Sequence, residues 1–270
     1  MVIPRALSLV VVALSMAVPT AHGQVVTIPN LSARLQIAPS GGPQYLEDPT
    51  LAAPIAISGS AFGSGISQGH GEAQVDWGVI RLHGTATSAS TSATGIFRDY
   101  LTITSPLVAD GTAAVLSFAL LIDGAFHVTG VGNAGWRASA HLGGGTNDQI
   151  NAGGTTFESS YFGDALGVYS GQSTFVFGQP LRAIVSLTGS VVGTGLFDLG
   201  HSLRWGGIQG ILVNGVAIDD FQVSSASGAD YRHAIAAVPE PAGVMLLAAG
   251  LAVLGWRRRA GGAARRALPA

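Results

Sequence analysis

The chain has 270 residues, of which 39 are glycine and 10% are charged, and its formal net charge at pH 7 is −2. It contains no cysteine, so disulfides, thiolate metal ligands and cysteine nucleophiles are excluded. From Gln24 to Val238, seven arginines and no lysine stand against fourteen acidic residues, a net charge of −7. A nucleic-acid partner is therefore not expected, because such partners require a basic surface.

The first 23 residues have the three parts of a secretory signal peptide. Arg5 lies in a short n-region, an apolar stretch runs from Ala6 to Val18, and small residues surround a cleavage site in Ala21-His22-Gly23. The apolar stretch would form a helix of only ~20 Å, too short to cross a membrane core of ~30 Å. We expect export by the Sec machinery and removal of residues 1–23.

The following segment, to about Ser58, is rich in turn-forming residues. Prolines at 29, 39, 43, 49 and 54 recur too closely for a helix to run between them. Extended pieces at Arg34–Ala38 and Ile55–Ser58 fit this spacing. The Gly/Ser run from Gly59 to Gly71 is expected to form a hairpin or a mobile loop.

From Gln74 onward the pattern is that of β-strands. Tyr100–Thr104 alternates apolar residues with threonine, and we interpret Thr85–Thr94 as the Ser/Thr/Ala connection before it. Thr112–Ile122 is almost continuously apolar, which predicts a central strand buried on both faces. Further strands are predicted at Phe126–Val131, Trp136–Leu142, Thr155–Tyr161, Ser173–Phe177 and Leu181–Val192.

The clearest local signal is Asn214-Gly215, which apolar residues flank on both sides. Asn-Gly accepts the positive φ angles of a type I′ turn, so Ile211–Ile218 is predicted to be a hairpin. No window between Gln24 and Val238 has helical periodicity.

Ten or more short strands with glycine-rich turns predict an all-β fold. We expect a single antiparallel β-sandwich or jelly-roll-like ectodomain over residues 24–223, made of two packed sheets. Residues 224–238 begin with the polar run Ser224–Gly228 and are expected to be a flexible tether.

The C-terminal end has the features of a membrane segment. Ala242–Trp256 carries no charge, and as a helix it would span ~22 Å, less than the ~30 Å hydrocarbon core. Arg257, Arg258 and Arg259 follow directly, with Arg265 and Arg266 beyond them, and by the positive-inside rule they place residues 260–270 in the cytoplasm. The signal helix and this short transmembrane helix would be the two helices of the chain.

The order of these C-terminal features carries a resemblance. Val238-Pro239-Glu240-Pro241, the apolar run and the arginine cluster resemble the PEP-CTERM sorting signal of exopolysaccharide-producing Gram-negative bacteria. On this resemblance Pro239, Glu240 and Pro241 match the recognition triplet, residues 239–259 form the sorting segment, and Arg257, Arg258 and Arg259 match the stop-transfer cluster. Ala260–Ala270 extends further than such tails usually do.

The resemblance implies where the protein goes. It implies processing by an exosortase, a membrane enzyme that acts near the triplet, after an inner-membrane intermediate. The processed chain would then reach the cell surface or the extracellular matrix of a Gram-negative bacterium. Exopolysaccharide is a candidate partner on this basis.

The candidate catalytic patterns are few. Gly65-Ile66-Ser67-Gln68-Gly69 has the spacing of a nucleophile elbow, but that motif requires a strand before it and a helix after it. The histidines show no zinc-binding spacing. We therefore expect no catalytic residues, no resident metal and no cofactor.

One loop is a candidate ligand site. Between Gly143 and Asn151, the side-chain oxygens of Asn147, Asp148 and Asn151 offer ligands for Ca²⁺ or sugar hydroxyls, although Asx-turns account for the same residues. Trp77, Trp136 and Trp205 are either sugar-stacking platforms or core residues.

The function predicted from the sequence is that of a non-enzymatic, exported surface or matrix protein associated with exopolysaccharide or biofilm. One alternative is a carbohydrate-binding β-sandwich module, which exposed Trp or Tyr on a concave sheet face would favour. The other is a surface hydrolase, which would require carboxylates or Ser and His to meet in a pocket.

Overall fold

The computed structural model describes residues 29–236, apart from 41, 43, 51–53, 144–147, 158 and 159. The predicted signal peptide, the sorting triplet, the transmembrane segment and the arginine cluster lie outside these residues. In the described part of the chain the regular elements are thirteen strands and no helix, which confirms the all-β prediction there. A helix long and apolar enough to cross a membrane is not found among these residues.

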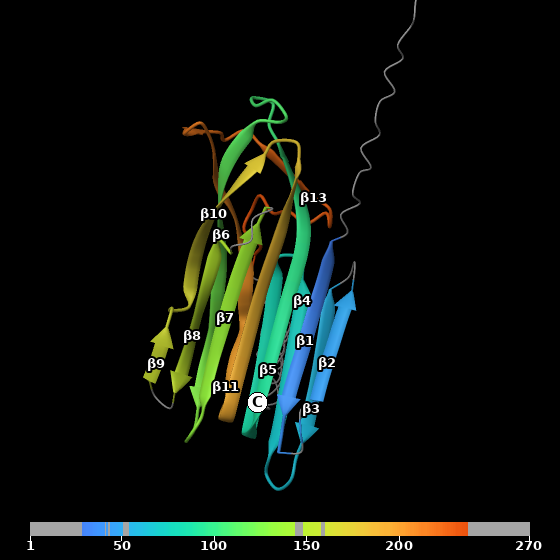
Figure 1. The fold of residues 1–270 in the computed structure, drawn as a ribbon, viewed down its shortest axis with the longest axis vertical. Coiled ribbons are helices and arrows are strands. Elements are labelled where there is room, and N and C mark those ends of the chain that lie inside the picture. The colour runs from blue at the N-terminus through green and yellow to red at the C-terminus, as the bar shows by residue number, and fades with distance from the viewer. Residues whose placement is uncertain are drawn as a thin grey trace, which may run out of the picture.

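The strands form one continuous antiparallel sheet (Figure 1). Their bounds are β1 Asn30–Ala38, β2 Gln44–Thr50, β3 Ile55–Phe62, β4 Gln68–Asp76, β5 Val79–Thr104, β6 Ala113–Val128, β7 Asn133–Leu142, β8 Ile150–Phe157, β9 Ser160–Gly163, β10 Gly167–Val176, β11 Pro180–Val213, β12 Val216–Ala217 and β13 Gln222–Ser225.

The sheet folds into two layers because the two longest strands belong to both. The second part of β5 and the first part of β11 pair with each other and with β1 and β7, giving the layer β2-β1-β5-β11-β7-β8-β9 that faces the viewer in Figure 1. The first part of β5 and the second part of β11 pair with β4 and β6, giving a second layer that β3 and β10 extend. The prediction of two packed sheets is therefore correct in layering, but the two sheets share strands.

Each long strand bends sharply where it changes layer. Ser88 in β5 has a φ of 48° and Gly193 in β11 a φ of 92°, and the β5–β11 register shifts between Gly193 and Gly195. The Ser88 backbone N–H donates to Thr194 Oγ1 at 3.2 Å, and Thr91 Oγ1 donates to the Thr85 carbonyl at 2.8 Å. These hydroxyl groups satisfy backbone groups that the broken ladder leaves unpaired.

These bends correct one prediction. Thr85–Thr94 is not a connection between strands but part of the 26-residue strand β5. The side chains that point into the core here are small, and Ala86, Ala89 and Ala93 are buried. The two parts of β5 can therefore lie close together on either side of the bend. Small side chains and hydroxyl groups are typical of loops as well, which is why the sequence pattern was ambiguous.

The core between the layers alternates large side chains with glycine. Phe197 on β11 is fully buried, and a Cβ atom added at Gly84 or Gly189 would lie 2.2 Å or 2.5 Å from its ring. Gly84 is its partner in β5, and Gly189 faces it from the other layer. The phenyl ring therefore fills the space that the two missing side chains leave.

Three further strand predictions have different outcomes. The Asn214-Gly215 hairpin is confirmed, with φ values of 50° and 82° and β11 paired to β12 across it. The Gly59–Gly71 segment is a hairpin, β3–β4, rather than a loop. Burial on both faces of Thr112–Ile122 is wrong, because β6 pairs with neighbours on both sides but alternates buried and half-buried residues along most of this stretch.

The segment expected to be a flexible tether is packed against the sandwich as far as it is described. Gln222–Ser225 is strand β13, paired with the end of β5, and Ala226 N–H donates to the Tyr100 carbonyl at 2.9 Å. Tyr231 is fully buried. The structure therefore corrects the expectation of a tether that begins at residue 224: the fold extends to at least Ile235.

Candidate functional site

The last described part of the chain, residues 226–236, crosses one end of the sandwich, and we call it the strap. It lies in the orange-red region at the upper end of Figure 1. Tyr231 of the strap packs edge to face against Trp205, with ring centroids 5.4 Å apart, and lies 6.2 Å from the Phe97 ring. Trp205 in turn stacks on Phe118 at 5.3 Å. The strap thus inserts one aromatic ring into an aromatic cluster contributed by β5, β6 and β11.

Backbone hydrogen bonds hold the strap on both sides of this ring. Trp205 Nε1 donates to the Tyr231 carbonyl at 2.7 Å, Ile208 N–H to the Arg232 carbonyl at 3.2 Å, and Ile235 N–H to the Trp205 carbonyl at 2.9 Å. Ile235 lies over Gly78, where an added Cβ atom would be 2.1 Å from its Cδ1. Glycine at position 78 accepts the positive φ of 74° that the turn requires. Because it has no side chain, it also leaves room for the Ile235 side chain.

A buried carboxylate orders the start of the strap. Asp99 is fully buried and accepts hydrogen bonds from the Tyr100 N–H at 2.7 Å, from the Ser227 N–H at 3.2 Å and from the Ser227 hydroxyl. The Tyr231 hydroxyl is buried beside the Asp99 carboxylate and Ser227. Burial, together with the nearby Asp99 carboxylate, raises the pKa of Tyr231 well above its ordinary value, so the phenol stays neutral.

The outer side of the strap is polar. Arg232 lies over the Phe221 ring at 4.5 Å and donates to the backbone carbonyls of Phe221 and Asp219. His233 Nδ1 is 2.8 Å from Asp230 Oδ2, and this hydrogen bond lowers the pKa of the Asp230 carboxyl. The Asp230–His233 pair is exposed, so its contribution to stability is small.

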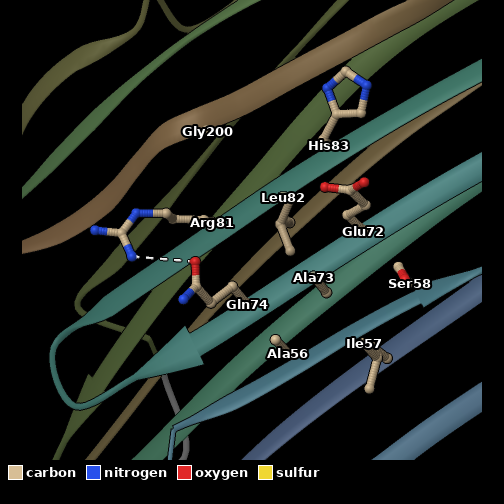
Figure 2. Close-up of a pocket in the computed structure, with 10 residues that line it drawn as sticks. All are labelled: Ala56, Ile57, Ser58, Glu72, Ala73, Gln74, Arg81, Leu82, His83 and Gly200. Atoms are coloured by element: carbon tan, nitrogen blue, oxygen red, sulfur yellow. Dashed lines mark hydrogen bonds between the residues drawn. The ribbon is translucent and has the colours of Figure 1, made fainter. Parts of the chain in front are cut away.

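A second candidate region is a groove of about 500 Å³ on the outer face of β3, β4, β5 and β11 (Figure 2). Glu72 and His83, which are partners in the β4–β5 register, lie side by side there, and His83 Nδ1 is 3.9 Å from Asp198 Oδ1. Arg81 donates to Gln74 Oε1 at 3.4 Å. The groove is therefore lined with hydrogen-bonding groups, including an acidic and a basic side chain, and its lining contains no Phe, Tyr or Trp.

Next to this groove, Ser60, His70 and Glu72 form a hydrogen-bonded row. Ser60 Oγ is 2.9 Å from His70 Nδ1, and His70 Nε2 is 2.9 Å from Glu72 Oε1. The His70 and Glu72 side chains are 37% and 56% exposed, so the row lies on an open sheet face. This row is not predictable from the sequence, because only the β3–β4 register brings Ser60 beside His70. The one local signal is the i, i+2 spacing of His70 and Glu72, which places both side chains on one face of a strand.

Ser67, the serine of the elbow-like pattern, has a structural contact network. It is 5% exposed, donates to the Ser88 carbonyl at 2.9 Å and accepts from the Ser40 N–H at 2.9 Å. Strand β4 follows it, not a helix. Its hydroxyl links the β3–β4 hairpin to the bend of β5.

The third candidate region is a trough of about 690 Å³ at the β7–β8–β9 edge, and it includes one predicted ligand residue. Asn151 lines it together with Arg137, Asp164 and the backbone of Gly153. Phe157 and Phe162, 48% and 61% exposed, meet there with ring centroids 6.1 Å apart. Gly153 N–H donates to Asp164 Oδ2 at 3.0 Å.

The predicted loop ligands are only partly assembled. Asp148 is exposed just before β8, Asn151 is exposed on β8, and Asn147 lies outside the described residues. Among the residues that the structure describes, no group of three or more His, Asp or Glu is placed to hold a metal ion. The Ca²⁺ prediction gains no support from these positions.

The tryptophans are core residues rather than platforms. Trp205 is fully buried, Trp136 is 5% exposed, and Trp77 packs half-buried against the core. Of the two interpretations, the structure favours the core for all three. The exposed aromatic side chains of the trough are phenylalanines instead.

Comparison with protein families gives one match. Residues 237–259 match the PEP-CTERM protein-sorting motif, which confirms the resemblance seen in the sequence. Pro239, Glu240, Pro241 and the arginines at 257–259 all fall in the matched stretch, which begins one residue after the described part of the strap. The motif implies processing by an exosortase membrane enzyme. Neither the comparison with curated proteins nor that with solved structures gives a match.

Proposed function

We propose that this chain, which carries a PEP-CTERM sorting motif, is a non-enzymatic surface or matrix protein whose β-sandwich is the cargo of that motif. In this proposal the signal peptide, residues 1–23, directs export through the Sec machinery. An exosortase then processes the chain near Pro239–Pro241, and the sandwich associates with exopolysaccharide at the cell surface or in a biofilm.

The observation that carries the proposal is the order of parts along the chain. A folded all-β unit ends at the strap, and the sorting motif begins directly after it at residue 237. A motif at this position delivers the whole sandwich as one unit. The apolar run beyond it is short for a permanent anchor, which supports removal rather than retention.

The test is intact-mass analysis of the protein recovered from the cell surface, in cells with and without the processing enzyme. We expect a chain that begins near Gln24 and ends near Pro239–Pro241 only when the enzyme is present. Recovery of the full apolar run and arginine tail as the sole form in both strains would contradict the proposal.

A carbohydrate-binding function is the second candidate, and the trough supports it. Exposed aromatic rings beside amide, guanidinium and carboxylate groups are the usual means of holding a sugar ring. Phe162→Ala should lower retention of the surface-recovered protein on immobilised exopolysaccharide. Phe62→Ala should not, because Phe62 is even more exposed, at 74% against 61%, but does not line the trough. Equal retention of both variants and the parent would remove the trough from consideration.

A further inference from the structure

We propose that the docked strap limits the rate of C-terminal processing, and that Tyr231 and Ile235 are the residues that set this rate. The inference rests on the proposed function, since it concerns how the processing enzyme gains access to its motif. It adds a role for the folded domain, which would control its own release.

The chain between the docked strap and the sorting triplet is short. Ile235 is docked on Gly78 and hydrogen-bonded to Trp205, and only residues 236–238 separate it from Pro239. Four Cα–Cα steps join Ile235 to Pro239, and together they span at most about 14 Å. The processing motif is therefore held within that distance of the end of the sandwich for as long as Ile235 stays docked.

A processing enzyme requires a free stretch of backbone around its recognition motif. Enzymes that bind peptides in a groove take several residues in extended form and pair with their backbone groups. Ile235 lies four residues before Pro239, and its N–H is already bonded to the Trp205 carbonyl. The same backbone cannot serve the sandwich and the enzyme together, so docking and processing compete.

The strap can detach while the rest of the sandwich stays folded. Beyond β13 it forms no strand pair. Its contacts are the buried Tyr231 ring, the Ile235 side chain, the hydrogen bonds of Ser227 to Asp99, the Arg232 contacts with Phe221 and a few hydrogen bonds to β11. Releasing it leaves the β5–β11 ladder intact. Such segments open locally at a lower free-energy cost than the whole domain.

The stability of the docked strap depends on Tyr231. Tyr231 is fully buried and its hydroxyl lies beside the Asp99 carboxylate, so both the ring and the hydroxyl lose this environment when the strap opens. When opening is fast relative to cleavage, the rate of cleavage follows the population of the open state. The stability of the docked strap therefore sets the population of the open state, and with it the rate of processing.

The experiment measures the processing rate by pulse-chase and intact mass in cells that contain the processing enzyme. Insertion of eight Gly/Ser residues between Ala236 and Ala237 touches no docking contact and gives the enzyme free chain, so processing should become about tenfold faster. Tyr231→Ala should have a similar effect, and Tyr231→Phe, which keeps the buried ring, should be processed at close to the parent rate.

Combining the changes separates the proposal from misfolding and from failure of sorting. In the inserted background, Tyr231→Ala should add nothing, because access no longer depends on the strap. An unchanged rate for the insertion variant would overturn the role of the strap, yet the correct product would still show that sorting occurs. Absence of the processed product from every variant and from the parent would instead overturn the proposed function.

Discussion

Trp205 donates its indole N–H to the Tyr231 carbonyl at 2.7 Å, and the two rings meet edge to face at 5.4 Å. The two residues are 26 positions apart, one in the longest strand and the other in the last described segment before the sorting motif. The end of the cargo is therefore part of its core. Loss of this contact should affect both the stability of the domain and the state of the strap.

Trp205→Ala should destabilise the sandwich by about 3–5 kcal/mol, because it leaves a large cavity between Phe118 and Tyr231. Denaturant unfolding of the intact chain in detergent checks this value. Trp77→Ala is the control, since Trp77 is only half-buried and should cost clearly less. A Trp205 variant as stable as the parent would mean that the aromatic cluster is not part of the core.

Gly189→Ala should destabilise the domain by about 1–3 kcal/mol through overpacking against Phe197. Gly210→Ala lies in the same strand, where an added Cβ meets nothing within 4 Å, and is the matched control. Thermal unfolding of the two variants should show a lower midpoint only for position 189. Equal midpoints would contradict the close approach of the two layers at Phe197.

The bend between the layers should depend on the Thr194 hydroxyl. Thr194→Val removes the acceptor of the Ser88 N–H and should cost about 0.5–1.5 kcal/mol of unfolding free energy. Hydrogen exchange at Ser88 should speed up more than exchange at the centre of β5. Unchanged protection at Ser88 would show that the two bends are held in another way.

Alkaline pH should release the strap. The pKa of Tyr231 is raised in the folded state by burial and then by Asp99, with a smaller effect of Asp76. Its contribution to stability is therefore complete below the ordinary tyrosine value of 10.0 and is lost as the pH rises above it. The free energy of unfolding should fall above pH 10 in the parent and less steeply in Tyr231→Phe; parallel curves would contradict the buried position of the phenol.

Local patterns in the sequence were sufficient for much of the fold. Alternating residues predicted strands such as Tyr100–Thr104, and the Asn214-Gly215 pair predicted its hairpin, because both depend on neighbouring residues alone. The sorting motif was equally readable, since its parts follow one another in sequence.

Features that depend on contacts between distant residues were not predictable. Thr85–Thr94 has the composition of a loop, and its partners in β1, β4 and β11 make it a strand. Tyr231 follows a polar run typical of a tether, and its burial depends on the space left by Gly78, Phe97 and Trp205. The row of Ser60, His70 and Glu72 likewise requires the β3–β4 register.

The central claim is that the C-terminal motif delivers this β-sandwich and is then cut away. Intact-mass analysis of surface material, in cells with and without the processing enzyme, tests it most directly. We expect a surface protein that ends near Pro239–Pro241 only in cells that contain the enzyme. A surface protein that keeps Ala242–Trp256 and the arginine cluster in both strains would contradict it.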